Sequence, residues 1–293
     1  MNTFLWGPPL WKLVHSLAYC AKASDADDVA LFFNSFKKVL PCVYCRRSFE
    51  EFDNTLRVKY NNQPLVSIIR KKQLFAWSYY LHDLVNEKLD RQEVEKQNNN
   101  GIRSSSSLNA AAIVAPRTLA PTTATTAPAP LTLRAKQLSF ECLEKKHVLH
   151  PVSVTVTDLF DILFIFAMNY PEDDKDEELV VKRQAYKQFL CTLPHVLTIL
   201  IQHGDPLIRI RQDPLFYFLQ HFKALITKKA LCEEVASGVL RSRKNMFCAI
   251  LIVWAKFYQH DIRQPAEARR LYNALTKRYS IAQAKACKHG SCL

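Results

Sequence analysis

The stretch Leu40-Pro41-Cys42-Val43-Tyr44-Cys45 interrupts helical apolar spacing and places two cysteines three residues apart. Pro41 should end or bend the helix before it, and proline suits the first turn of a following helix. Two cysteines at a helix start can close a short disulfide, and the positive end of the helix favours the thiolate form of one of them. The stretch therefore predicts a redox-active pair at the junction of two helices.

Half of a zinc site is the alternative interpretation of Cys42 and Cys45. Structural zinc needs about four ligands, usually from two such pairs. The sequence has no second C-x-x-C among its nine cysteines, and most of the others stand singly. The surroundings of the pair decide between the two interpretations.

Apolar residues spaced three and four apart predict one-sided helices around the cysteine pair. The spacing recurs in three sets: Leu10, Val14, Leu17 and Ala18; then Val29, Phe32, Phe33, Phe36, Val39 and Leu40; then Leu74, Trp77, Leu81, Leu84, Val85 and Leu89. We therefore expect residues 1–91 to form a compact helical unit.

Two helical faces in this unit carry aromatic, imidazole and amide groups. Trp11 and His15 are four residues apart, as are His82 and Asn86, so each pair shares one face. Each residue taken singly could be an ordinary core or surface residue. Together they flank the cysteine pair, and a flat ring system with a polar edge and an adenine would fit between such faces.

The order of these motifs resembles the Erv/ALR family of sulfhydryl oxidases. The chain has Trp-Gly-x-x-x-Trp-x-x-x-His from Trp6, then Pro-Cys-x-x-Cys from Pro41, then His-x-x-Val-Asn-x-x-Leu from His82. The resemblance covers residues 6–89 and implies a four-helix bundle that holds FAD at one end, next to the C-x-x-C. Two features depart from it: Asp83 stands where the family usually has Asn, and a linker replaces the aromatic-bearing helix that often covers the cofactor.

The resemblance also implies roles for individual residues. Cys45 would be the flavin-proximal thiolate and Cys42 the thiol that exchanges with incoming dithiols. The implied cofactor-binding residues are Gly7, Leu10, Trp11, His15, Phe49, His82, Asn86 and Leu89.

The activity implied is that of a FAD-dependent thiol oxidase. It would form disulfides in dithiol protein substrates and pass electrons through FAD to molecular oxygen, giving hydrogen peroxide. Family members commonly form homodimers. A catalytically silent helical scaffold and a zinc-binding adaptor are the alternatives.

The short catalytic unit with a large appended segment resembles the versions carried by large DNA viruses. This resemblance places the chain in the cytoplasm of a host cell or in a virion, with the mitochondrial intermembrane space as the alternative.

The bulk composition excludes several classes of protein. The net charge is +13, but the basic residues are scattered and do not interleave with aromatics as in a single-strand binder, so no nucleic acid is required. No apolar run reaches 18 residues, so we expect no membrane span. Trp6, Pro8, Pro9 and Lys12 interrupt any apolar core of a signal peptide.

Beyond the first unit, the chain is predicted to be all-α as well. An Asn-, Ser- and Ala/Thr/Pro-rich stretch without aromatics predicts a flexible linker over residues 92–137. Residues 138–281 form the predicted second helical domain. Its candidate helices are Val156–Met168, Glu177–Cys191, Pro214–Lys228, Arg243–Tyr258 and Pro265–Tyr279.

This second domain has features of a degenerate copy of the first. Phe160 and Phe164 have the spacing of Trp11 and His15, and Leu193-Pro194-His195 mirrors Leu40-Pro41-Cys42. His195 and Thr198 replace the two cysteines. We interpret residues 155–232 as a bundle without FAD or disulfide chemistry; an unrelated helical domain is the alternative.

The tail, residues 282–293, has no apolar periodicity and contains Cys287 and Cys292. Members of the family often carry a second cysteine pair on a flexible arm that delivers electrons to the C-x-x-C. The resemblance therefore predicts a shuttle role for these two residues. Two incidental cysteines or a Cys–His metal cluster are the alternatives.

Overall fold

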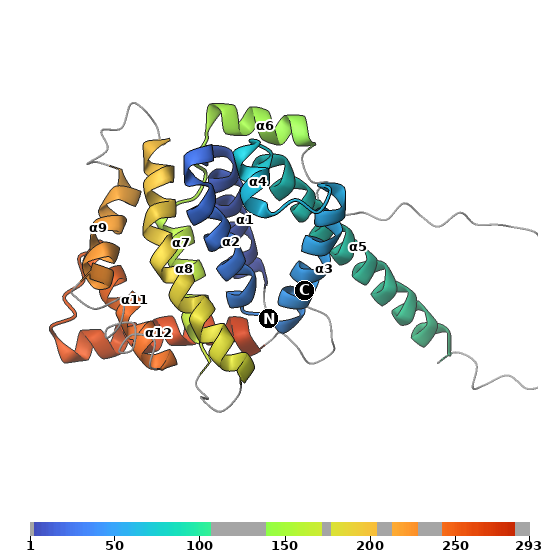
Figure 1. Cartoon of the computed structure of the whole chain (residues 1–293). Helices are drawn as coiled ribbons and strands as arrows, with labels where there is room; N and C mark the ends of the chain where they lie inside the picture. The colour runs from blue at the N-terminus through green and yellow to red at the C-terminus, as the bar shows by residue number, and fades with distance from the viewer. Residues whose placement is uncertain (1–2, 107–138, 172–176, 204–212, 228–241, 285–293) are drawn as a thin grey trace, which may run out of the picture.

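The structure, a computed structural model, describes residues 3–106, 139–171, 177–203, 213–227 and 242–284. These residues form helices and no strands, so the all-α prediction is confirmed for them (Figure 1). The helices are α1 (Thr3–Cys20), α2 (Ala26–Val39), α3 (Val43–Lys59), α4 (Leu65–Arg70), α5 (Leu74–Ser106), α6 (Phe140–Leu149), α7 (Val156–Met168), α8 (Glu177–Gln202), α9 (Pro214–Thr227), α11 (Arg243–Phe257) and α12 (Pro265–Ala284).

Helices α1, α2, α3 and α5 form the predicted bundle, with the short α4 between α3 and α5. The apolar face of α2 is buried at each position that its spacing predicted, from Val29 to Val39. Pro41 lies between α2 and α3, and α3 begins at Val43 with Cys42 as its N-cap. The predicted junction is confirmed, but Pro41 lies two residues before the first residue of α3 and not in its first turn.

Helix α8 differs from its prediction. It was expected to end at Cys191, but it continues through Pro194 to Gln202. Proline removes one backbone hydrogen bond, which usually ends or kinks a helix. Here residues on both sides of Pro194, such as Leu193 and Leu197, are buried in the core. This burial stabilises the helix across the proline.

The predicted linker also begins later than expected. Helix α5 continues to Ser106, so residues 92–106 are helical, and the last turns of α5 extend away from the bundle (Figure 1). The sequence from Arg91 to Gln97 consists mainly of good helix formers and contains no proline. The rest of the predicted linker, residues 107–137, lies outside the described residues.

The later helices share one apolar core with the first bundle. Helix α2 packs along α8, and α1 packs against α7. The ring of Phe189 in α8 lies 5.3 Å from that of Phe32 in α2 and 5.2 Å from that of Phe166 in α7. At the edge of the core, Lys12 Nζ forms an ion pair with Asp158 at 3.0 Å.

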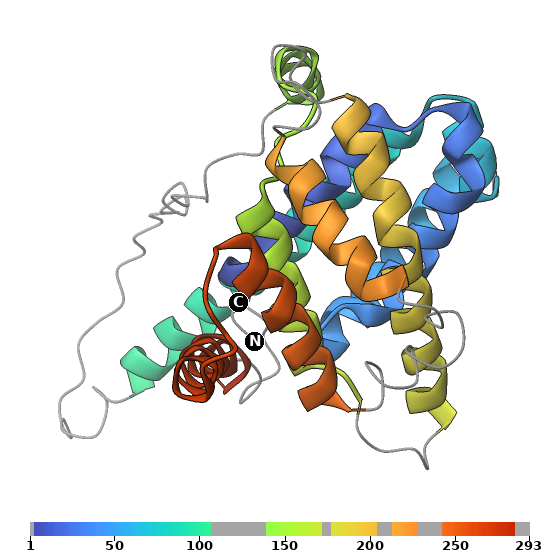
Figure 2. The same ribbon diagram turned by 90° about the vertical axis from the view of Figure 1, so that its left-hand side faces the viewer.

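This pairing is relevant to the predicted internal repeat, in which α7 and α8 correspond to α1 and α2. Corresponding helices then pack on each other, as they do between copies related by a two-fold axis. Figure 2 shows α8 running beside α2 and α7 beside α1. The repeat itself and the expected homodimer stay predictions, but a dimer could not use the surface of α1 and α2 that α7 and α8 cover.

Helix α6 is the element that matters most for the site. It follows the predicted linker and lies across one end of the bundle, at the top of Figures 1 and 2. Ser139 caps it by accepting a hydrogen bond from the backbone N–H of Cys142 at 3.3 Å. Among the described residues, no helix has the length and apolar character needed to cross a membrane.

Candidate redox and cofactor site

The cysteine pair occupies the first turn of α3. Cys42 is the N-cap, and its Sγ accepts a hydrogen bond from the backbone N–H of Cys45 at 3.4 Å. This contact and the positive end of the helix both favour negative charge on the Cys42 sulfur. The redox role of the pair stays a prediction, and the structure shows the pair at a helix start, as the motif predicted.

The two cysteines differ in accessibility. Only 2% of Cys42 is exposed, whereas Cys45 is half-buried. The turn before Cys42 is held by Arg46, whose guanidinium donates to the carbonyl oxygen of Leu40 at 2.8 Å. On the neighbouring helix α8, the Tyr186 hydroxyl lies 3.5 Å from the carbonyl oxygen of Val39. Because Cys42 is buried, an incoming thiolate reaches its sulfur only if neighbouring side chains shift.

A second group of residues lies where α1 faces α5. The ring of Trp11 stacks on that of His82 at a centroid distance of 3.9 Å and an angle of 11°. His15 Nε2 lies 3.0 Å from His82 Nδ1, and His15 Nδ1 lies 3.1 Å from Ser78 Oγ. The structure therefore brings three of the predicted cofactor residues into direct contact.

The hydrogen bonds of this group determine where its protons lie. The Ser78 hydroxyl donates its single proton to the carbonyl oxygen of Phe75 at 2.8 Å. Ser78 Oγ must then accept from His15 Nδ1–H, so Nε2 of a neutral His15 accepts from His82 Nδ1–H. The chain of bonds leaves Nε2 of His82 as a hydrogen-bond acceptor.

Burial keeps these imidazoles neutral. It lowers the pKa of His15 to about 3, and the nearby His82 and His147 contribute to this shift. Burial likewise lowers the pKa of His82 to about 4. At neutral pH, both rings therefore have one donor and one acceptor nitrogen and no charge.

Helix α6 adds a third imidazole to this group. The ring of His147 lies 6.2 Å from that of His15, 5.1 Å from that of Phe75 and 5.7 Å from that of Tyr19. Phe140, at the start of α6, also contacts Phe75, with ring centroids 5.8 Å apart. Helix α6 thus covers the α1–α5 group with aromatic side chains.

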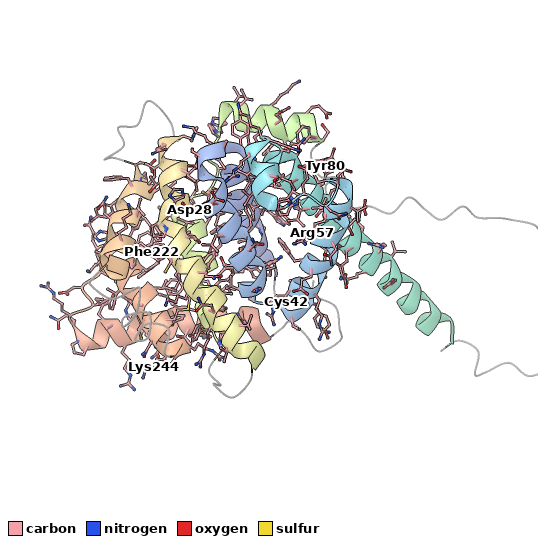
Figure 3. The ribbon with its side chains drawn as sticks, viewed as in Figure 1. Asp28, Cys42, Arg57, Tyr80, Phe222 and Lys244 are labelled. Carbon is pink, nitrogen blue, oxygen red and sulfur yellow. The ribbon has the colours of Figure 1, made fainter. Side chains whose placement is uncertain are left out.

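The packing of α3 against α5 relates the histidine group to the cysteine pair. Lys88 of α5 bonds to Ser48, near the start of α3, and Lys59 at the end of α3 lies 3.0 Å above the ring of Tyr80. The helices are therefore antiparallel, and Figure 3 shows Cys42 and Tyr80 toward opposite ends of the pair.

His82, Asn86 and Leu89 follow one face of α5, and all three are half-buried. The rise of an α-helix separates His82 from Leu89 by roughly 10 Å. Because Leu89 is nearest the level of Cys45, this face leads from the histidine group toward the cysteine pair.

The remaining predicted residues support these two groups. Gly7 is half-buried and Leu10 is buried, both on α1 ahead of Trp11. Phe49 is buried one turn after Cys45, with its ring 6.1 Å from that of Phe36 in α2. Cys287 and Cys292 lie outside the described residues.

Sequence reasoning missed Ser78, Tyr19, Phe75 and His147. Ser78 lies four residues before His82, so the helical spacing that linked His82 with Asn86 could have identified it. His147 has no such signal, because 64 residues separate it from His82 and only the folded chain brings α6 to the site.

Within the described residues, no group of three or more His, Cys, Asp or Glu side chains is arranged to hold a metal ion. In particular, His15 and His82 bond to each other.

The fold and the site define a helical-bundle protein with a cysteine pair at a helix N-terminus and an aromatic–imidazole group along the same bundle. Residues 8–104, about a third of the chain, match the family model described as the Erv1 / Alr family. This match supports the family resemblance of the first segment and, with it, FAD-linked sulfhydryl oxidase chemistry in general terms. No curated protein and no solved structure matches the sequence.

Proposed function

We propose that the protein is a FAD-dependent thiol oxidase that forms disulfides in dithiol-containing proteins. One observation carries the proposal: the face of α5 from His82 to Leu89 connects the imidazole group with the level of the cysteine pair in α3. A cofactor with two ring systems can extend along such a face. The family match over residues 8–104 supports the same conclusion.

The residues present fit FAD in two respects. Flat aromatic and imidazole rings gather at the His82 end, where an adenine can stack. Among the described residues, the buried polar atoms without a hydrogen-bond partner include Nε1 of Trp6 on α1, a donor, and Nε2 of His147 on α6. A large cofactor with both donors and acceptors can satisfy such atoms. Trp11, His15, His82, Asn86 and Leu89 would hold it.

The proposed chemistry begins at the Cys42–Cys45 disulfide. A substrate thiolate attacks one sulfur, forms a mixed disulfide and releases the other cysteine as a thiolate. The second substrate thiolate then displaces the enzyme cysteine, so the substrate leaves as a disulfide and both enzyme cysteines are reduced. FAD, when bound, would accept the two electrons as the Cys42–Cys45 disulfide re-forms, and would pass them with the two thiol protons to molecular oxygen, giving hydrogen peroxide.

The proposed division of roles assigns exchange to Cys42 and contact with the flavin to Cys45. The hydrogen bond from Cys45 N–H stabilises Cys42 as a leaving thiolate. Half-buried Cys45 can be covered by a cofactor without rearrangement of the helices. Exchange at Cys42 requires the side chains that bury its sulfur to move when a substrate docks.

The test combines the visible absorbance of bound flavin with dithiol-dependent oxygen consumption. The purified protein should contain flavin and oxidise dithiothreitol. The variant Cys45→Ser should keep the flavin and lose turnover, whereas Cys191→Ser, an exposed position on α8, should behave as wild type. Full turnover by Cys45→Ser would refute the mechanism, and a protein without flavin would favour the scaffold alternative.

A further inference from the structure

His147 is a buried histidine that the proposed mechanism does not use. Only 2% of it is exposed, although it lies on α6, outside the segment that matches the family model. Its ring is enclosed by those of His15, Tyr19 and Phe75. Most histidines so deeply buried satisfy both ring nitrogens.

His147 satisfies only one. Its Nδ1 lies 3.0 Å from the carbonyl oxygen of Leu143 one turn earlier, and a carbonyl can only accept, so Nδ1 carries the proton. Burial lowers the pKa of His147, which keeps the ring neutral and makes Nε2 an acceptor. This Nε2 is buried and has no hydrogen-bond partner in the part of the chain that the structure describes. Leaving such an atom unsatisfied destabilises a protein, so a ligand that donates a hydrogen bond there gains affinity.

The position of His147 indicates which part of a ligand it meets. It contacts His15, which bonds to His82, so it belongs to the end of the site that lies roughly 10 Å from Leu89 and the cysteine level. If the flavin must reach Cys45, the adenosine half of FAD lies at the His147 end. The enclosing rings suit a planar base, and adenine has an exocyclic amino group that donates hydrogen bonds.

We propose that α6 completes the cofactor site and that His147 Nε2 accepts a hydrogen bond from the adenine amino group of FAD. The inference rests on the proposed function, because it assumes that FAD is the cofactor. It gives the segment after the predicted linker a direct part in cofactor binding. It also accounts for the aromatic cover formed by Phe140 and His147 over Phe75.

The first measurement is the Kd for FAD. FAD is titrated against apoprotein of the full-length chain, and flavin fluorescence reports the binding. His147→Phe keeps a ring but removes the acceptor, and should raise the Kd for FAD about tenfold. His147→Gln can present its Oε1 where Nε2 lies and should stay within about threefold of wild type. The matched control is His150→Gln, an exposed position at the end of the same helix, which should bind FAD as wild type.

The second measurement identifies the donor with an FAD analogue that has hypoxanthine in place of adenine. A carbonyl oxygen then replaces the amino group, so wild type should bind the analogue at least about tenfold more weakly than FAD. For His147→Phe, the Kd values for FAD and for the analogue should agree within about twofold. The variant lacks the acceptor, so loss of the amino group costs it no further hydrogen bond. Equal affinity of wild type for FAD and the analogue, or unchanged FAD affinity in His147→Phe, would overturn the inference.

The outcomes separate this inference from the proposed function. A wild-type protein that binds no flavin refutes both. Flavin binding that is insensitive to His147 and to the amino group refutes only the role of α6. Thermal unfolding of each apoprotein shows whether a variant folds; if His147→Phe does not, the comparison of FAD with its analogue on wild type and His147→Gln decides.

Discussion

Phe189→Ala provides a test of whether the helices after residue 138 support the first bundle, formed by α1, α2, α3 and α5. Phe189 is completely buried (0% exposed) in α8, and its ring lies between Phe32 of α2 and Phe166 of α7. Truncation of such a phenylalanine costs about 3–5 kcal/mol, because it removes apolar contacts and leaves a cavity. A change of this size is a large fraction of the stability of a typical protein. In a chain of this size it should lower the Tm by roughly 10 °C.

The assay can report on the first bundle alone. Three of the four tryptophans, Trp6, Trp11 and Trp77, lie in residues 1–91, and the fourth is Trp254 in α11. In a Trp254→Phe background, tryptophan fluorescence follows the unfolding of the first bundle, while far-UV circular dichroism follows all helices. If both parts share one core, Phe189→Ala should lower both transitions together.

The matched control is Val181→Ala on the same helix. Val181 is 51% exposed, so its truncation should change the Tm by less than about 2 °C. Two results together would refute a shared core. The tryptophan transition of Phe189→Ala would stay at the wild-type temperature, and part of the circular dichroism signal would be lost in a separate transition at lower temperature. Those results would mean that the first bundle folds without help from α8.

Three further predictions concern the site and the tail. The free energy of unfolding should fall as the pH falls from about 6.5 toward about 4. The folded-state pKa values of His15 and His82 are about 3 and about 4, against 6.5 for an ordinary histidine. The unfolded chain therefore binds protons first, which favours unfolding over this pH range. A pH series of Tm values checks this, and His82→Gln should show a smaller slope; an identical slope would contradict the assignment. Trp11→Ala and His82→Ala should each lower the flavin content of the purified protein, measured as the ratio of flavin to protein absorbance, because each removes a wall of the site; unchanged content in both would mean that the cofactor lies elsewhere. Deletion of residues 286–293 should slow oxidation of protein dithiols but not of dithiothreitol if Cys287 and Cys292 form a shuttle, and equal rates on both substrates before and after deletion would exclude that role.

Local spacing in the sequence was sufficient to predict most of the bundle. The α2–α3 junction at Pro41, the start of α3 beside the cysteine pair and the full extent of α7 follow from short-range rules of proline geometry, capping and helical periodicity. The sequence predicted that His15 and His82 lie on two helix faces of one site, but it did not predict that they are in contact. Helical periodicity predicts which residues share a face, but it does not specify the distance between two faces.

The errors in the predicted bounds of α8 and α5 have different causes. Pro194 predicts a helix end by local rules, yet α8 continues because residues on both sides of it, such as Leu193 and Leu197, are buried in the core. The polar composition after Arg91 predicts a linker, yet α5 continues to Ser106. At α5 the helix formers from Arg91 to Gln97 are a local signal that the linker prediction overlooked. For α8 the compensating energy comes from tertiary packing that the local sequence does not contain.

The sequence by itself determined the chemistry of the first segment: the cysteine pair, its position at a helix start, and the faces that carry Trp11, His15, His82 and Asn86. These features depend on residues close together in the chain, where backbone geometry alone sets the spacing. Only the tertiary structure decided that α7 and α8 share the core of the first bundle and that α6 brings His147 against His15. Those contacts join residues more than a hundred positions apart, and they form because apolar helix faces must be buried against one another, whatever their order in the sequence.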